Sequence, residues 1–401
     1  MNGFRLSVCV LILASFGTNG SSNAGNTRAD DEIERNPGAI VEPESSRVER
    51  RDPSGRHADQ NRKRTQGESK PHKQIVSYEL GVGPRSYMIF EPSDPKPIRA
   101  PVVVFLHGWF AVNPAIYGAW IDHLVRSGKI VIFPRYQNDF STAPQEFLGN
   151  AVAAIRDALG VLATGRGHVR PRLDQIGLIG HSAGGNLAAY IAAVASNPNS
   201  GIPSPKAVVA VMPGEVFPQK EPNLADIPAK TLLVVMVGEE DILVGDSRGR
   251  EIFAEAVAIP RAHKRFILFR SDRHGYPPLV AEHTAPTGAN RRLDTGHGVL
   301  KSLQLSLGEV NAFDHAGFWR IADMTLDAGF SGKSLDRAVR DPEQFRHLGY
   351  WSDGRRVTPP IVADNLDDVP RVILSNGVRI IPWRLPERLS FGQNSDQTQA
   401  R

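Results

Sequence analysis

The pattern of hydrophobic and polar positions changes at about Lys73. Between residues 19 and 72 the sequence consists of Ser, Asn, Gly, Pro and charged residues, with almost no aliphatic ones. Such a segment cannot bury enough apolar surface to offset the entropy that it would lose on ordering. We therefore predict a disordered basic linker over residues 25–72 and a folded region that begins at residue 73.

Beyond Lys73, apolar runs of strand length alternate with segments of helical periodicity. An antiparallel opening pair is expected at residues 74–80 and 86–91, and buried strands at 102–106 and 130–133. Further strands are expected at 176–179, 207–212, 232–237 and 266–269, and helices at 117–125, 145–162 and 186–195. This alternation predicts an α/β fold with a mostly parallel central sheet flanked by helices, over residues 73–283.

The chain continues well past this core. Between residues 284 and 375, apolar residues at helical spacing predict an extension that packs on the core, followed by a C-terminal tail at 376–401. The aromatic stretch at residues 350–354 could cover a cleft or close the core.

The first residues read as a targeting signal. A short charged start is followed by an apolar run at residues 6–16 and by small polar residues. Because this run is shorter than the roughly twenty residues that span a bilayer, we predict a signal peptide at 1–24 and a secreted or periplasmic protein without a stable membrane span.

The charge distribution and the cysteine content exclude some partners and some kinds of chemistry. The formal net charge is +4, but residues 47–73 hold nine Lys/Arg against four Asp/Glu, or +5, which leaves about −1 elsewhere. The folded region is therefore close to neutral, and we expect no nucleic-acid partner. The only cysteine, Cys9, lies in the apolar run, so the mature chain would have neither disulfide nor thiolate chemistry.

One pentapeptide points to nucleophilic catalysis. Gly180-His181-Ser182-Ala183-Gly184 follows an apolar strand and opens an Ala-rich helix. Small residues on both sides permit the strained turn that exposes a nucleophilic serine. The alternative is that Ser182 only caps the helix.

A serine nucleophile also needs donors for the oxyanion that forms during the reaction. Residues 106–109, Leu-His-Gly-Trp, end an earlier strand of the same sheet. We expect the backbone N–H groups of Trp109 and Ala183 to supply these donors, and the imidazole of His107 to brace the loop.

The acid of a triad is expected at the end of a later strand. Gly238-Glu239-Glu240-Asp241 follows the predicted strand at 232–237. The spacing from the strand favours Asp241, with Glu239 and Glu240 as competitors.

The base must follow the acid in chain order. His274 comes directly after the predicted strand at 266–269 and precedes a glycine, which suits a catalytic histidine. His283, His297 and His315 are rivals that could instead be loop or core residues.

These motifs resemble the α/β-hydrolase superfamily over about residues 74–283, and more particularly its esterase, lipase and dienelactone-hydrolase group. The resemblance implies an acyl-enzyme on Ser182, with His274 moving the proton and Asp241 holding the imidazole. It implies no metal or organic cofactor, and the histidines show no zinc spacing. The expected partner is a small or polymeric ester. A catalytically weak binding module, a peptidase or an acyltransferase are the alternatives.

Overall fold

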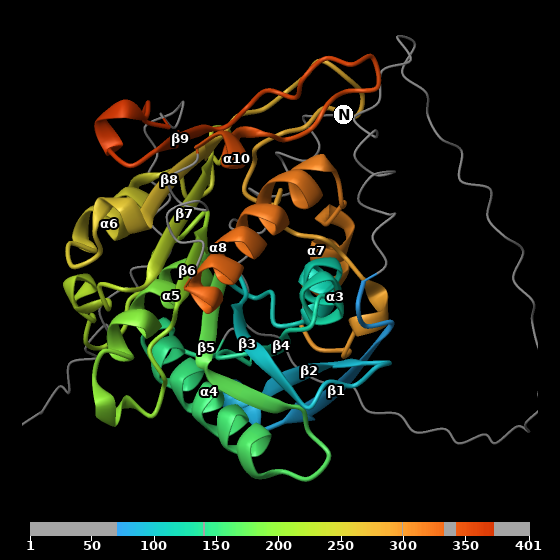
Figure 1. Ribbon diagram of the computed structural model, residues 1–401, viewed down its shortest axis with the longest axis vertical. Coiled ribbons are helices and arrows are strands. Elements are labelled where there is room, and N and C mark those ends of the chain that lie inside the picture. The colour runs from blue at the N-terminus through green and yellow to red at the C-terminus, as the bar shows by residue number, and fades with distance from the viewer. Residues whose placement is uncertain (1–69, 139–140, 299, 333–341, 373–401) are drawn as a thin grey trace, which may run out of the picture. The chain divides into compact units, whose positions relative to one another are not determined.

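The computed structural model describes residues 70–138, 141–298, 300–332 and 342–372 (Figure 1). The predicted signal peptide, the predicted linker up to residue 69 and the predicted tail at 376–401 lie outside the described residues. All elements named below belong to the described part of the chain.

A nine-stranded sheet forms the centre of the fold, in the order β1-β2-β4-β3-β5-β6-β7-β8-β9. The strands from β4 to β8 in this order run parallel, while β1, β2 and β9 pair antiparallel with their neighbours. The strands are β1 (Gln74–Leu80), β2 (Tyr87–Ser93), β3 (Arg99–Leu106), β4 (Ile130–Pro134), β5 (Arg170–His181), β6 (Ala207–Val211), β7 (Leu232–Gly238), β8 (Lys264–Phe269) and β9 (Ile361–Ala363).

Helices cover both faces of this sheet. They are α3 (Gly118–Arg126), α4 (Phe147–Thr164), α5 (Ala183–Val194), α6 (Ser247–Glu255), α7 (Lys301–Leu307), α8 (Arg320–Ser331) and α10 (Pro342–Arg346). A π-helical segment, Phe313–Trp319, leads into α8. The predicted α/β fold with a mostly parallel sheet is therefore confirmed.

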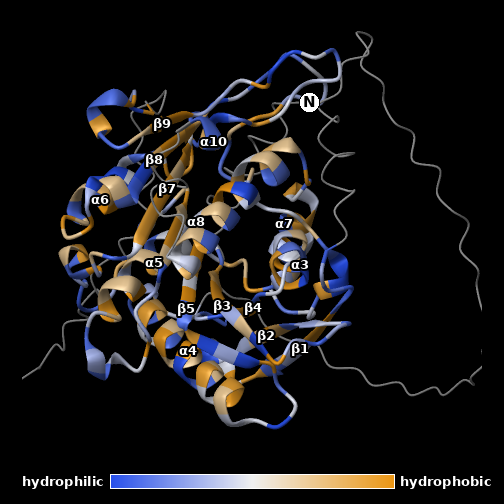
Figure 2. Ribbon diagram, viewed as in Figure 1, coloured by the Kyte–Doolittle hydropathy of each residue, from blue (hydrophilic) through white to orange (hydrophobic). Residues whose placement is uncertain are grey.

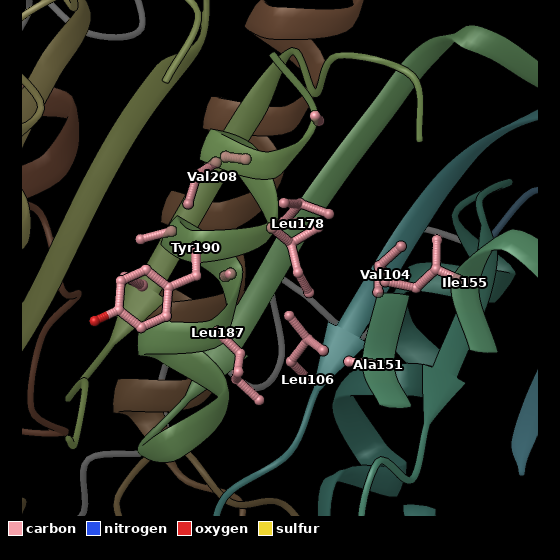
Figure 3. Packing of buried hydrophobic residues seen from close by; sticks show 14 of the residues in the cluster. Val104, Leu106, Ala151, Ile155, Leu178, Leu187, Tyr190 and Val208 are labelled. Carbon is pink, nitrogen blue, oxygen red and sulfur yellow. The ribbon is translucent and has the colours of Figure 1, made fainter. Parts of the chain in front are cut away.

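Alternating strand residues enter two separate cores, because successive side chains point to opposite faces of a sheet. Val104 and Leu106 of β3 pack with α4, α5 and α6, whereas Val103 and Phe105 pack with α3 and α8. The strands in the middle of the sheet are largely hydrophobic, and the helices are hydrophobic mainly on their inner sides (Figure 2). Figure 3 shows the first core, with Val104, Leu106, Leu178 and Val208 of the sheet against Ala151, Ile155, Leu187 and Tyr190 of the helices.

The segment at residues 144–164, which includes α4, is long and apolar enough to cross a bilayer by length and composition. The buried side of α4 packs on the sheet, as the core helix of a globular domain does.

Several elements of the fold were not predicted, among them α6, α7, α10 and β9. Helix α6 has only two buried apolar side chains, Ile252 and Phe253, and it buries Arg248 and Arg250 as well. Strand β9 has three residues and comes from the C-terminal extension, where it pairs with β8. Residues of the extension thus add an edge strand to the sheet, and α8 buries Leu326 in the core beside β5.

Candidate active site

Ser182 lies in the turn between β5 and α5, at the carboxyl edge of the parallel strands. Its φ of 56° and ψ of −127° are strained for a residue with a side chain. The neighbouring glycines allow the turn, because a Cβ on Gly180 would lie 2.0 Å from the Gly184 oxygen, and one on Gly184 would lie 2.2 Å from the Leu106 oxygen. The local geometry is that of a nucleophile elbow.

His283 connects Ser182 to Asp241. Its Nε2 lies 2.9 Å from Ser182 Oγ, and its Nδ1 lies 2.8 Å from Asp241 Oδ2. Since a carboxylate only accepts, Nδ1–H donates to Asp241 and leaves Nε2 to accept the serine hydroxyl. The structure therefore brings the predicted Ser182 and Asp241 together through the rival histidine.

The Asp241 carboxylate is fully buried and has fixed partners on both oxygens. Oδ1 accepts from the backbone N–H groups of Leu243 and Val244, each at 3.1 Å, while Oδ2 faces His283. The turn that follows β7 supplies these donors and orients the acid toward the imidazole. A buried charge that is paired and hydrogen-bonded in this way is held in one geometry.

The expectation that His274 completes this constellation is wrong. Nε2 of His274 lies 2.7 Å from Asp353 Oδ2, and its Nδ1 lies 3.0 Å from Arg355 Nη1. Arg355 can only donate, so Nδ1 accepts from it and Nε2–H donates to Asp353. Both ring nitrogens of His274 are thus engaged with the C-terminal extension.

The course of the loop after β8 explains why the later histidine reaches the serine. Asp272 and Leu279 form an antiparallel bridge, and Ala281 N donates to Ser271 Oγ at 3.0 Å, so the loop folds back on itself. Ala281 O then accepts from Glu240 N beside the acid turn. The short apolar run at residues 279–281, just before His283, was the feature of the sequence that could have indicated His283 as the base.

The remaining rivals have other partners. Glu239 accepts from Ser271 N, and Glu240 pairs with Arg273, whose hydrogen bond lowers the pKa of the Glu240 carboxyl. The Nε2 of His297 lies 3.0 Å from Glu79. The ring of His315 packs edge-on against Trp319.

The loop after β3 lies against the serine. A Cβ on Gly108 would come within 3.3 Å of Ser182 Cβ, and the Gly108 N–H already donates to Tyr117 Oη at 2.9 Å. Within the described residues, the N–H groups of Trp109 and Ala183 make no hydrogen bond. Neither of the two predicted donors is therefore engaged by another group of the described residues.

His107 is fully buried beneath this loop. Its ring stacks on Tyr136 at 4.1 Å, and its nitrogens face the carbonyl oxygens of Gly108 and Arg135 at 2.6 and 2.8 Å. Burial lowers the pKa of His107 to about 4, so the ring is neutral at pH 7 and only one nitrogen donates at a time. These contacts hold the loop after β3 in place, and no contact joins the His107 ring to Ser182.

Trp351 of the extension is fully buried and closes the core. Its Nε1 donates to Asp272 Oδ2 at 3.0 Å, and its ring fills the space beside Gly275. Of the two interpretations of the aromatic stretch at 350–354, the structure supports the one in which this side chain closes the core.

Among the described residues there is no group of three or more His, Cys, Asp or Glu side chains that could hold a metal ion.

Comparison with known proteins agrees with this fold. The family model described as Chlorophyllase matches residues 63–223, which contain Ser182 and the loop after β3 but neither Asp241 nor His283. No curated protein matches the sequence. The match covers less than half of the chain and shows similarity to that family over this stretch. That family is part of the α/β-hydrolase superfamily, and together with the nine-stranded sheet the match supports an ester hydrolase of the α/β-hydrolase type.

Proposed function

We propose that this protein is an exported serine hydrolase that cleaves carboxylic esters through an acyl-enzyme on Ser182, with His283 as the base and Asp241 as the acid. The observation that carries the proposal is the continuous contact from Ser182 Oγ to His283 Nε2 and from His283 Nδ1 to Asp241 Oδ2. A serine hydroxyl is a poor nucleophile unless such a base takes its proton.

In the first half-reaction, Ser182 Oγ attacks the ester carbonyl carbon while its proton passes to His283 Nε2. The N–H groups of Trp109 and Ala183 stabilise the charge on the carbonyl oxygen of the tetrahedral intermediate. The intermediate collapses, the bond to the alcohol oxygen breaks, and the proton on His283 goes to the leaving alcohol. The acyl group then remains on Ser182.

In the second half-reaction, water attacks the acyl carbon and gives a proton to His283. Collapse of the second intermediate releases the carboxylic acid and returns the proton to Ser182. Throughout, Asp241 holds the imidazole so that Nε2 faces the serine, and it stabilises the imidazolium that forms.

The family match guides the choice of substrates. The description of that family names chlorophyll, so a chlorophyll ester belongs in the substrate panel beside nitrophenyl esters of several acyl lengths and polymeric esters. Export rests on the charged start and the apolar run of residues 6–16. Secretion of the full-length chain, with a new N-terminus near residue 24, tests that part separately.

The chemistry is tested with a fluorophosphonate probe and a nitrophenyl ester. We expect the probe to label Ser182, mapped by mass spectrometry, and we expect Ser182→Ala to lose both labelling and turnover. Ser204→Ala is the matched control, because Ser204 is an exposed serine on the loop before β6. Labelling that persists in Ser182→Ala contradicts the proposal. Labelling without turnover of any ester favours a binding module.

A further inference from the structure

His181, the residue before the nucleophile, connects two loops of the site. Its Nε2 lies 2.8 Å from the backbone oxygen of His283, and its Nδ1 lies 2.8 Å from Tyr117 Oη. Tyr117 Oη in turn accepts from Gly108 N at 2.9 Å. A hydrogen-bonded chain thus runs from the loop after β3 to the loop that carries the base.

Every proton in this chain can be placed. A carbonyl oxygen only accepts, so Nε2 of His181 carries a hydrogen and donates to His283 O. Burial, with His283 nearby, holds the pKa of His181 well below its usual value, so the ring is neutral and Nδ1 has a lone pair. Tyr117 therefore donates its hydroxyl hydrogen to Nδ1, while its oxygen accepts from Gly108.

The direction of the hydrogen bonds in this series cannot reverse. Tyr117 and His181 are both buried, with exposed fractions of 1% and 4%. The Gly108 N–H cannot accept, so the Tyr117 hydroxyl cannot turn its hydrogen toward it. The His283 carbonyl thereby sets the tautomer of His181, and the Tyr117 hydroxyl satisfies the Nδ1 lone pair that this tautomer leaves. Buried chains of this kind hold groups in one geometry when every member is satisfied.

We propose that Tyr117 and His181 are positioning residues, which lock the loop bearing His283 to the loop bearing the oxyanion donor Trp109. The inference rests on the proposed function, since it assigns His283 as the base. Neither residue contacts the reacting atoms. They act by fixing the backbone of the base and by accepting from the Gly108 N–H, which holds the backbone just before the predicted oxyanion donor Trp109.

Tyr117→Phe keeps the ring and removes the hydroxyl. Nδ1 of His181 and the Gly108 N–H then both lose their partner, so the hydrogen-bonded connection between the two loops is broken. We expect kcat for a nitrophenyl ester to fall about tenfold, with KM changed less than twofold, because a small misplacement of the base affects the chemical step.

The matched control is Tyr87→Phe. Tyr87 is also fully buried, and its hydroxyl donates to Asp157 at 2.6 Å. It lies on β2, three strands from β5 in the sheet, or roughly 14 Å at ordinary strand spacing. A purely structural role for Tyr117 predicts the same kcat in both variants at equal amounts of folded protein, and that result would overturn the inference.

Two substitutions of His181 separate its two hydrogen bonds. Gln places an amide N–H at the level of Nε2 and can still donate to His283 O, whereas Asn places its amide at the level of Nδ1 and reaches only Tyr117. We expect His181→Gln to retain kcat within about threefold, and His181→Asn to lose tenfold or more. The opposite order contradicts the inference.

A spectroscopic measurement reads the tautomer directly. In protein labelled with ¹⁵N-histidine, the His181 signals, assigned by their loss in His181→Gln, should report a neutral ring with its proton on Nε2. In Tyr117→Phe the Nδ1 signal should shift because its hydrogen bond is lost while the proton stays on Nε2, and an unchanged Nδ1 signal would overturn the role given to Tyr117. If the wild type shows neither probe labelling nor turnover, the proposed function fails. If the wild type is active and Tyr117→Phe equals Tyr87→Phe, only this inference fails.

Discussion

Two histidine–aspartate pairs stand at opposite ends of the loop that follows β8. His283 pairs with Asp241, and His274 pairs with Asp353, at almost the same distances of 2.8 and 2.7 Å. The two differ in which ring nitrogen meets the carboxylate. His283 uses Nδ1 and keeps Nε2 for the serine, whereas His274 uses Nε2 and accepts from Arg355 at Nδ1.

The surroundings of the two carboxylates differ as well. Asp241 is fully buried and receives two backbone N–H groups, whereas the side chain of Asp353 is 36% exposed. Water partly screens the second pair. A histidine beside an aspartate is therefore not in itself a catalytic base. The base is the one with a buried, oriented acid on one nitrogen and a hydroxyl on the other.

The largest difference is expected between substitutions of the two histidines. His283→Ala removes the proton acceptor, so kcat should fall by about 10⁴ to 10⁶. His274→Ala should stay within about threefold of the wild type, because His274 contacts neither Ser182 nor Asp241. Steady-state hydrolysis of a nitrophenyl ester measures both variants. A loss in His274→Ala that matches that of His283→Ala would refute the distinction.

The two carboxylates should differ almost as strongly. Asp241→Asn changes the group that sets the tautomer of His283, and kcat should fall by about 10³ to 10⁴. Asp353→Asn is the matched substitution in the other pair and should leave kcat unchanged. If Asp241→Asn keeps full activity while it remains folded, Asp241 is not the acid.

The loop between the two histidines is fastened by Asp272, which is 5% exposed and accepts from Trp351 Nε1, from Thr358 and from His274 N. Asp272→Asn replaces one carboxylate oxygen by an amide NH2, which cannot accept the hydrogen bonds that these groups donate. The free energy of unfolding should therefore fall by about 2 to 3 kcal/mol. Urea unfolding at pH 7 measures the change. An unaltered midpoint would show that the extension does not hold this loop.

Asp272 also makes the stability of the protein depend on pH. Burial alone would raise the pKa of Asp272, but its hydrogen bonds from Trp351 and Thr358 outweigh burial and lower it. Its contribution to stability is therefore complete above the unfolded pKa of about 3.9 and is lost as the pH falls through the lower folded pKa. Below about pH 4 the wild type should lose stability more steeply than Asp272→Asn. Parallel curves would contradict this.

The smallest effect is expected at the exposed pair. Removing the contact between His274 and Asp353 by Asp353→Asn should cost less than about 1 kcal/mol, because partly exposed ion pairs contribute little. The same urea experiment measures it. A loss as large as that of Asp272→Asn would mean that this pair, rather than Asp272, anchors the extension.

The elements that place the nucleophile could be predicted from the sequence. Parallel strands such as β6 and β7 are continuous apolar runs, and the small residues around Ser182 indicate the nucleophile elbow. Asp241 follows its strand by only three residues, so counting along the chain was sufficient. These features are local.

The base could not be found in this way. His283 lies fourteen residues after Phe269, in the loop that follows β8. The path of this loop depends on the bridge between Asp272 and Leu279 and on Trp351 from the extension. A local pattern favoured the first histidine after the strand, whereas tertiary contacts select the second. Helix α6 was missed because it has few apolar residues, and the edge strand β9 because it has only three residues.

The most direct test of the account is the rate at which a fluorophosphonate labels Ser182 in wild type, His283→Gln and His274→Gln at equal concentrations of folded protein. The account predicts that His274→Gln is labelled at the rate of the wild type, and that His283→Gln remains unlabelled when the other two have reacted completely. Rapid labelling of His283→Gln together with slow labelling of His274→Gln would contradict it.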